Sequence, residues 1–171
     1  ISEWVANNYT DGFDFLYTSE YTRSLETAAL LNILEPSWRI SPFLRERFWG
    51  DFERTLISDR EKLYGALVKD AESAPYYWRP PNGESLVDVI ARIKLLFGTL
   101  AREWSGKRGL IVCHGEVIQA MSIELERLSE HDYIQNGFSQ VDNCDIVHYT
   151  RMNGDILMPH FYAKRMIVSQ Q

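Results

Sequence analysis

The stretch Gly109-Leu-Ile-Val-Cys-His114-Gly115-Glu-Val-Ile-Gln-Ala-Met121 decides the fold. Its four apolar residues, 110–113, run directly into a His-Gly pair, and Val117, Ile118 and Met121 follow at helical spacing. This pattern predicts a buried strand that ends in a sharp turn and opens a helix.

The junction between this strand and helix is the first candidate for a binding site. Ligands in open α/β sheets bind at the carboxyl ends of strands, where helix N-termini present free N–H groups. We expect His114 to stand at this edge, and Gly115 to let a ligand approach the backbone. The alternative is that His114 only caps the helix or bonds a carbonyl. The local pattern favours the anion site.

The composition is ordinary for a globular protein, with 45% hydrophobic and 25% charged residues in a chain of 171. This length predicts a single domain over residues 1–171. The net charge of −6 and the lack of a basic patch argue against a nucleic-acid partner. A small, locally basic pocket for an anion remains compatible with this charge. No stretch is apolar for long enough to predict a membrane span.

The two cysteines, Cys113 and Cys144, lie inside apolar runs. Buried, unpaired thiols are typical of reducing compartments, so we expect a cytoplasmic protein.

Strand and helix patterns alternate along most of the chain. Strands are predicted at residues 13–17, 38–40 and 109–113, and longer helices at 20–34, 58–72, 85–104 and 115–128. Short helices should open at Ser2 and Ser129. Residues 43–54 fit neither period and are predicted as an ordered loop. Residues 74–83 are read as either a lid or an aromatic-packed connection.

This alternation implies βαβ units, and therefore a doubly wound, mostly parallel α/β sheet with helices on both faces. Two final strands, residues 146–150 and 157–162, flank the turn Asn153-Gly154-Asp155. They predict an antiparallel hairpin at an edge of the sheet near the C-terminus.

The segment Ser19-Glu20-Tyr21-Thr22-Arg23 repeats the geometry of the His114 stretch. It is a strand end that opens a helix, with an arginine about one turn inside. Such an arginine can grip a phosphate together with the helix N-terminus. An exposed arginine paired with a neighbouring glutamate would show the same pattern, and the segment alone does not decide between them.

Glu46 lies between Arg45 and Arg47 in the predicted loop. One interpretation is a solvated charge cluster. The other makes Glu46 a general acid/base and lets Arg47 meet the substrate's own charge. The pKa of a carboxyl group rises near a dianionic phosphate, which suits donation of a proton to a leaving oxygen.

A metal site is not expected. His131, His148 and His160 lack ligand spacing with one another and with the cysteines. Cys113 precedes His114, but neighbouring side chains of a strand point to opposite faces. Cys113 is therefore predicted to be a core residue.

Several stretches follow one another in an order that is itself informative. They are Ser19-x3-Arg23-x3-Thr27-Ala28, Leu44-Arg45-Glu46-Arg47-Phe48-Trp49-Gly50-Asp51-Phe52-Glu53, Pro80-Pro81-Asn82-Gly83-Glu84-Ser85, Val112-Cys113-His114-Gly115-Glu116-Val117-Ile118 and Asn143-Cys144. In this order they resemble the motifs of the histidine phosphatase superfamily, the phosphoglycerate-mutase-like group.

The resemblance implies a three-layer α/β sandwich whose pocket holds a phosphoryl group, with a histidine phosphorylated transiently. By position, Arg23 would be a phosphate clamp, Glu46 the proton donor and His114 the second pocket histidine. Phosphoryl transfer needs charge neutralisation around an in-line displacement, which a cationic histidine and an arginine supply. The resemblance implies no metal and no cofactor.

The sequence departs from this family in one respect. The family's first motif, an Arg-His-Gly triplet that carries the nucleophile, does not occur in these residues. We expect the triplet, the first strand and the start of the first helix to precede Ile1.

The expected function is hydrolysis of a small phosphorylated substrate. In the family that the chain resembles, mutases tend to carry a longer insertion between these motifs, so the short interval from Trp49 to Pro80 favours a phosphatase. In contrast, Glu46-Arg47-Phe48-Trp49-Gly50 resembles the mutase form of its motif. A phosphoglycerate-type mutase and a non-catalytic phosphate-binding protein are the alternatives. Neither nucleic acid nor membrane is expected as a partner, and exposed edge strands would permit a homodimer.

Overall fold

Strand β1 (Phe15–Thr18) is the centre of a three-stranded parallel sheet with the order β2-β1-β3. Strand β2 is Trp38–Ile40 and strand β3 is Gly109–Val112. Thr18 pairs with Ile40 on one side and Val112 on the other, so the carboxyl ends of all three strands meet at one edge. The computed structural model describes residues 1–136, 141–149 and 166–168.

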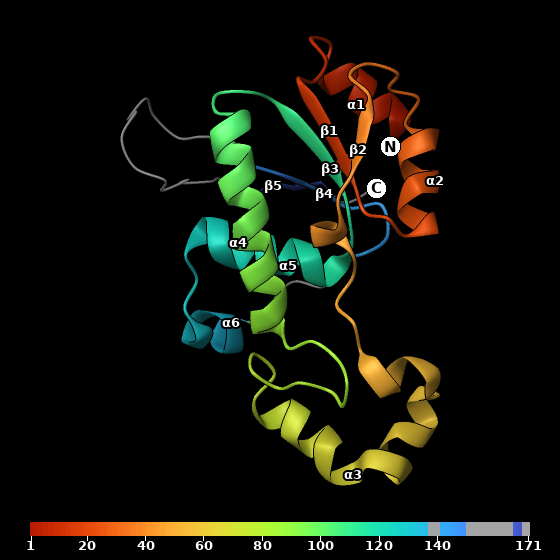
Figure 1. Cartoon of the computed structure of the whole chain (residues 1–171), viewed down its shortest axis with the longest axis vertical. Coiled ribbons are helices and arrows are strands. Elements are labelled where there is room, and N and C mark those ends of the chain that lie inside the picture. The colour runs from red at the N-terminus through yellow and green to blue at the C-terminus, as the bar shows by residue number, and fades with distance from the viewer. Residues whose placement is uncertain (137–140, 150–165, 169–171) are drawn as a thin grey trace.

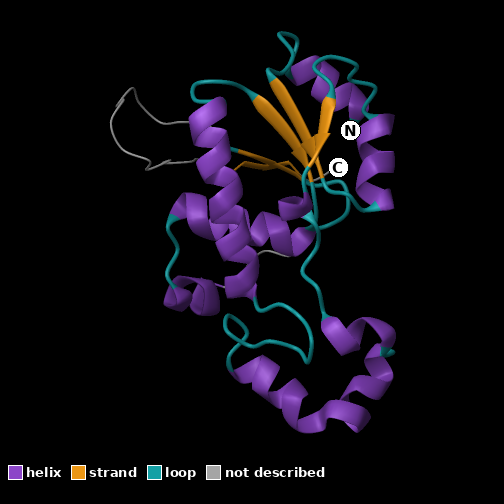
Figure 2. Cartoon of the chain, in the orientation of Figure 1, coloured by secondary structure: helices purple, strands orange, loops and turns teal. Residues whose placement is uncertain are grey.

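Helices cover both faces of this sheet, as Figures 1 and 2 show. Helices α1 (Ser2–Asn8) and α2 (Thr22–Leu30) lie on one side, and α4 (Leu86–Glu103) and α5 (Gly115–Glu126) on the other. Successive side chains of a strand point to opposite faces. Phe15 and Tyr17 accordingly pack with α4 and α5 in the main core, and Leu16 is fully buried on the other face. The predicted α/β fold with a parallel sheet between helices is confirmed.

Helix α4 forms where its sequence pattern predicts it. The Ser85 hydroxyl accepts the Asp88 N–H, and the Asp88 carboxylate accepts the Ser85 N–H, which makes a capping box. Val89, Ile93 and Leu96 recur on one face and are buried against the sheet and α5.

The segment between β2 and α4 extends away from the sheet (Figure 1). It contains two short 3₁₀ helices, Pro42–Leu44 and Gly50–Arg54, followed by α3 (Ile57–Ser73). The predicted loop over residues 43–54 is therefore partly helical. Helix α3 is interrupted at Tyr64, whose ring packs 4.8 Å from that of Phe52, centroid to centroid.

Two glycines hold the loop that carries Glu46 against the loop before α4. Gly50 has a φ of +55°, and a Cβ there would lie 2.0 Å from the Pro81 carbonyl oxygen. A Cβ on Gly83 would lie 2.6 Å from the Phe48 carbonyl oxygen. Because glycine has no side chain, the two loops approach closely enough for two backbone hydrogen bonds, from Asp51 N–H to Pro81 O and from Glu84 N–H to Phe48 O. Residues 74–83 thus form a packed connection.

Helix α2 is shorter than its pattern predicts, ending at Leu30 and not at residue 34. Asn32 takes a φ of +54°, and this left-handed residue turns the chain toward β2. Leu30 and Leu34 consequently remain largely exposed.

Beyond α5, the short helix α6 (Glu130–Asn136) begins after Ser129, as predicted. Strand β4 (Ile146–His148) pairs antiparallel with β5 (Met166–Val168) in a separate two-stranded sheet. The predicted turn 153–155 and strand 157–162 lie outside the described residues, so the edge hairpin stays a prediction. In the part of the chain that the structure describes, no helix has the length and apolarity needed to cross a bilayer.

Candidate active site

The candidate site lies at the edge where the parallel strands end. Ser19 follows β1, and its N–H bonds the carbonyl of Val112, the last residue of β3. His114 follows β3 and is the N-cap of α5. A cavity of about 1240 Å³ opens beside this edge, and its lining includes Arg23, Glu46, His114 and Gly115. Residues from three separate stretches of the sequence thus meet in one cavity.

His114 is held from both sides of its ring. It is 6% exposed. Arg23 Nε donates to Nδ1 across 3.2 Å, and Nε2 lies 2.8 Å from the hydroxyl oxygen of Ser19 and 3.4 Å from that of Ser24. The ring of Tyr21 meets it edge-on at 5.2 Å between centroids. His114 caps no N–H with its side chain, which disfavours the simple capping interpretation.

Burial, together with the positive charges of Arg23 and Arg92, lowers the pKa of His114 to about 4. The ring is therefore neutral at neutral pH, whereas the sequence suggested a cation. A neutral imidazole has one protonated nitrogen. Because Nδ1 accepts from Arg23, we assign the proton to Nε2, which donates to Ser19.

Arg23 is exposed and stands in the first turn of α2. Its guanidinium carbon lies 4.9 Å from the centre of the Tyr21 ring, and its Nε bonds His114. No ion pair to a glutamate is formed by Arg23 among the described residues. Its contacts favour the interpretation of Arg23 as part of the anion site.

Glu46 is partly buried in the wall of the cavity. Burial raises the pKa of its carboxyl group, and the nearby charge of Glu116 adds to this. The N–H of Arg47, 2.9 Å from Oε1, and the charges of Arg23 and Arg92 act in the opposite direction. A carboxyl group with a raised pKa is suited to act as a general acid.

Arg47 lies away from this group. It is 5% exposed and is absent from the described lining of the cavity. Its guanidinium donates to the carbonyls of Glu84 and Trp78 and to the Glu116 carboxylate, 3.0 Å away. The sequence pattern predicted that Arg47 contacts substrate. To do so, its guanidinium would have to break all three of these hydrogen bonds. The position of Arg47 instead supports the loop that presents Glu46.

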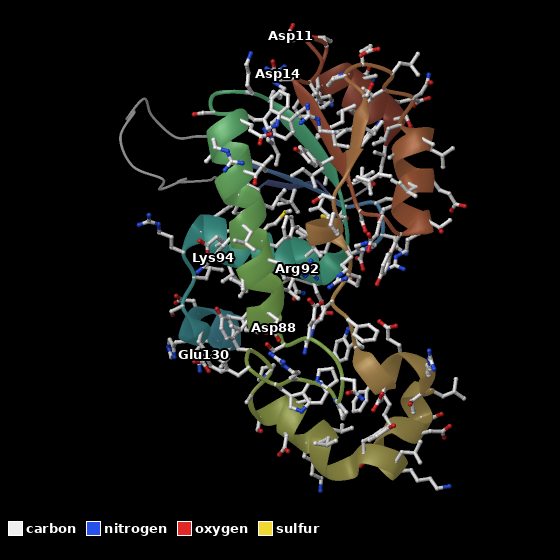
Figure 3. The ribbon with its side chains drawn as sticks, in the orientation of Figure 1. Asp11, Asp14, Asp88, Arg92, Lys94 and Glu130 are labelled. Carbon is white, nitrogen blue, oxygen red and sulfur yellow. The ribbon has the colours of Figure 1, made fainter. Side chains whose placement is uncertain are left out.

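Arg92, labelled in Figure 3, is a site residue that the sequence pattern did not reveal. It lies on the buried face of α4, where a hydrophobic residue would be expected. Its guanidinium forms two hydrogen bonds with the Glu84 carboxylate, at 3.1 and 3.2 Å, and also donates to the carbonyl of Phe43. The only local sign of Arg92 in the sequence was that it interrupts the apolar face of α4. Ser19 and Ser24 were likewise visible only as strand-end and helix-start residues.

Other candidate residues fall outside the group. Cys113, next to His114, was predicted to be a core residue; it is half-buried, packs against the core and also lines the cavity, and burial raises the pKa of its thiol to about 12. His148 lines the same cavity but meets the ring of Tyr9 edge-on, and Tyr9 in turn packs on Phe13, which precedes β1. The described residues contain no cluster of three potential metal ligands. His160 lies outside the described part of the chain.

An arginine, a histidine, a carboxyl group and a helix N-terminus converge at this sheet edge, and such groups are suited to bind a small oxyanion. Comparison with known proteins agrees with this kind of site. The sequence profile of the histidine phosphatase superfamily (branch 1) matches residues 2–161, and the chain belongs to this superfamily.

The curated relatives that match are phosphoglycerate mutases. The 2,3-bisphosphoglycerate-dependent phosphoglycerate mutase of Methylobacterium radiotolerans is 32% identical over 126 residues, which cover 70% of this chain and 59% of that protein. The phosphoglycerate mutase of Schizosaccharomyces pombe is 30% identical over 123 residues, or 68% of this chain and 58% of that protein. The matched region thus spans less than two thirds of these relatives.

Solved structures with the same fold include phosphatases. A mycobacterial glucosyl-3-phosphoglycerate phosphatase superposes with a TM-score of 0.67 at 26% identity, over 77% of this chain and 65% of that chain. The alpha-ribazole phosphatase of Shigella flexneri gives a TM-score of 0.72 at 21% identity, over 99% of this chain and 81% of that chain. The second likeness concerns the fold alone.

Proposed function

We propose that this protein is a phosphatase that hydrolyses a phosphomonoester through a phosphohistidine intermediate. The observation that carries the proposal is the meeting of Arg23, Glu46, His114 and the first turn of α5 in one cavity. Proteins of the same superfamily catalyse phosphoryl chemistry as phosphatases or mutases.

Each residue has a role that its position supports. The exposed guanidinium of Arg23 would bind the phosphoryl oxygens, because arginine offers two parallel donors to an oxyanion. The first N–H groups of α5 have no partner within the helix and point toward the same anion. A Cβ on Gly115 would meet only one atom, at 3.9 Å, so a ligand has room beside it. His114 would stabilise the equatorial oxygens of the transition state.

Glu46 would donate the proton to the leaving oxygen, and its raised pKa supports this role. The nucleophilic histidine is proposed to come from sequence that precedes Ile1. Neither a metal ion nor a cofactor takes part in this scheme. The substrate is proposed to be a small phosphorylated molecule.

The test is the release of inorganic phosphate from a chromogenic phosphomonoester by the product of the complete reading frame. We expect steady turnover that vanadate inhibits. If the complete protein releases no phosphate and isomerises no phosphoglycerate, the enzymatic proposal fails.

A phosphoglycerate-type mutase is the second candidate, favoured by the curated relatives and by the motif at residues 46–50. A mutase would interconvert 3- and 2-phosphoglycerate faster than it releases phosphate from either. A third candidate, a non-catalytic family member, would bind phosphate or vanadate without turnover. Measuring isomerisation, phosphate release and binding on one preparation separates the three.

Two further proposals concern the setting of the protein. A cytoplasmic location is supported by the free thiols of Cys113 and Cys144, of which Cys144 is exposed and not buried as predicted. A homodimer is supported by the position of β2 at the edge of the three-stranded sheet and by the 59% exposure of Ile40.

A further inference from the structure

The two nitrogens of the His114 ring lie in different surroundings. On the Nε2 side are Ser19 and Ser24, which are 0% and 3% exposed. On the Nδ1 side is Arg23, which is exposed and lines the cavity. A small ligand in the cavity can reach the Nδ1 side beside the exposed Arg23, whereas on the Nε2 side Ser24 is a nearly buried part of the cavity wall and Ser19 lies outside the described lining.

Ser19 is well placed to hold the Nε2 proton. Its hydroxyl oxygen lies 2.8 Å from Nε2 and also accepts the N–H of Tyr21 at 3.3 Å. Its own N–H is fixed to the end of β3 by the bond to Val112. Ser24 lies farther from Nε2, at 3.4 Å. Arg23, which can only donate to Nδ1, and the Ser19 oxygen, which is placed to accept from Nε2, together favour the Nε2–H form of the ring.

We propose that Ser19 is a positioning residue that keeps the proton of His114 on Nε2, so that Nδ1 is the nitrogen that changes partner when an oxyanion binds. An anion between Arg23 and His114 would accept the Arg23 Nε–H that Nδ1 now accepts. Nδ1 would then take up a proton and donate to the anion as well. This inference rests on the proposed phosphate site and adds to it the device that sets the charge of His114.

The charges around the ring agree with this exchange. Arg23 on α2 and Arg92 on α4 disfavour a cationic His114. Glu46, on the loop before the second 3₁₀ helix, lines the same cavity, and Glu116 on α5 is paired with Arg47. A phosphate dianion would offset the two arginines, because a nearby negative charge favours the charged form of histidine. Phosphate binding and proton uptake are therefore coupled.

The test is nuclear magnetic resonance of the ¹⁵N-labelled histidines, which reports the protonation of each ring nitrogen. In wild-type protein at neutral pH we expect His114 to carry its proton on Nε2. Saturation with inorganic phosphate should protonate both nitrogens, and calorimetry in buffers of different ionisation enthalpy should show uptake of up to about one proton per phosphate bound.

Two variants separate Ser19 from its neighbour. Ser19→Ala should give a mixture of both neutral tautomers and at least a tenfold lower kcat with a smaller change in KM. Ser24→Ala should keep the Nε2–H tautomer. Circular dichroism checks that both variants are folded, and Ser19→Thr, which keeps a hydroxyl, should restore the wild-type tautomer.

The proposal is overturned if His114 carries its proton on Nδ1 without phosphate, or if Ser19→Ala leaves the tautomer unchanged. It is also overturned if Ser24→Ala has the same effect as Ser19→Ala, or if phosphate binds without protonating Nδ1. Failure of phosphate to bind would instead sink the proposed function and the ligand-linked step, while the tautomer of the wild type and of Ser19→Ala would still decide the role of Ser19.

Discussion

His114 combines deep burial with an ionisable ring, and this has a consequence for stability. Its pKa is about 4 in the folded protein and near 6.5 in the unfolded chain. Between these values the unfolded chain binds the proton and the folded protein does not. The contribution of the neutral ring to the free energy of unfolding is thus fully present above pH 6.5 and is lost as the pH falls toward 4.

We therefore expect wild-type protein to lose more unfolding free energy than His114→Gln between pH 7 and pH 4.5, by up to ~3 kcal/mol. Urea unfolding at several pH values measures the difference. Parallel pH profiles for the two proteins would show that His114 is not kept neutral by the fold.

The role of Glu46 is tested by varying the leaving group. Glu46→Gln cannot donate a proton, so hydrolysis of an alkyl phosphate should fall by about 10²–10⁴-fold. Hydrolysis of a nitrophenyl ester, whose leaving oxygen needs no proton, should fall far less. The raised pKa of Glu46 keeps the acid protonated to higher pH. The alkaline decline of kcat for the alkyl ester should therefore disappear in the variant.

The matched control is Glu26→Gln, which changes an exposed glutamate on α2. Its kinetics should match the wild type for both esters. An equal loss for both esters in Glu46→Gln would contradict the assignment of Glu46 as the proton donor.

The positions of single residues were predictable where local sequence fixed them. Arg23 and His114 each follow a strand and open a helix, and both were placed correctly at the sheet edge. The partners of Arg47 were not predictable, because Glu116 is 69 positions away in the chain. No periodicity or turn signal reports such a pairing.

At the scale of elements, the Glu46 loop is positioned by contacts between loops. Gly50 needs both a left-handed backbone and the absence of a Cβ. Gly50→Ala should therefore destabilise the protein by at least ~2 kcal/mol and lower its activity, because the loop must move away from Pro81.

Gly98→Ala provides the comparison within α4. A Cβ there meets no atom within 4 Å, so the substitution should stabilise the protein by about 0.5–1 kcal/mol through helix propensity. Thermal and urea unfolding give both values. Equal effects of the two substitutions would mean that the packing of the two loops does not depend on Gly50.

Arg47 joins the Glu46 loop, the connection before α4 and helix α5. Removing one partner of a buried ion pair costs about 3–5 kcal/mol, and we expect a loss of this size in Arg47→Ala. Arg45→Ala, which changes its exposed neighbour, should alter stability by less than ~0.5 kcal/mol. A raised KM with unchanged stability in Arg47→Ala would instead favour direct contact with substrate.

The elements themselves followed from the sequence to different extents. Helix α4 was predictable because its capping pair, its apolar period and its end all indicate the same helix. Helix α2 was predicted too long, because a left-handed Asn32 ends it inside an apolar run. The 3₁₀ helix Gly50–Arg54 has no period long enough to detect.

At the scale of the whole molecule, an acidic protein of net charge −6 places Arg23 and the N-terminus of α5 at one cavity, and the charge of the buried Arg92 also acts on His114. This local positive charge would attract a phosphate to the proposed site although the molecule as a whole is acidic. The order of the motifs along the chain predicted the fold and the superfamily. It did not predict the substrate, which depends on side chains brought together only by folding.

The most direct measurement of the central claim compares kcat/KM for a chromogenic phosphomonoester in the complete wild-type protein, Arg23→Ala and Arg102→Ala. Both arginines are exposed and lie on helices, but Arg102 stands in the last turn of α4, outside the described lining of the cavity. Removing one preorganised charge-stabilising donor typically costs ~10²–10³ in rate. We predict a loss of this size in Arg23→Ala and wild-type kinetics in Arg102→Ala. Near-normal turnover in Arg23→Ala would contradict the placement of the phosphoryl group between Arg23 and His114.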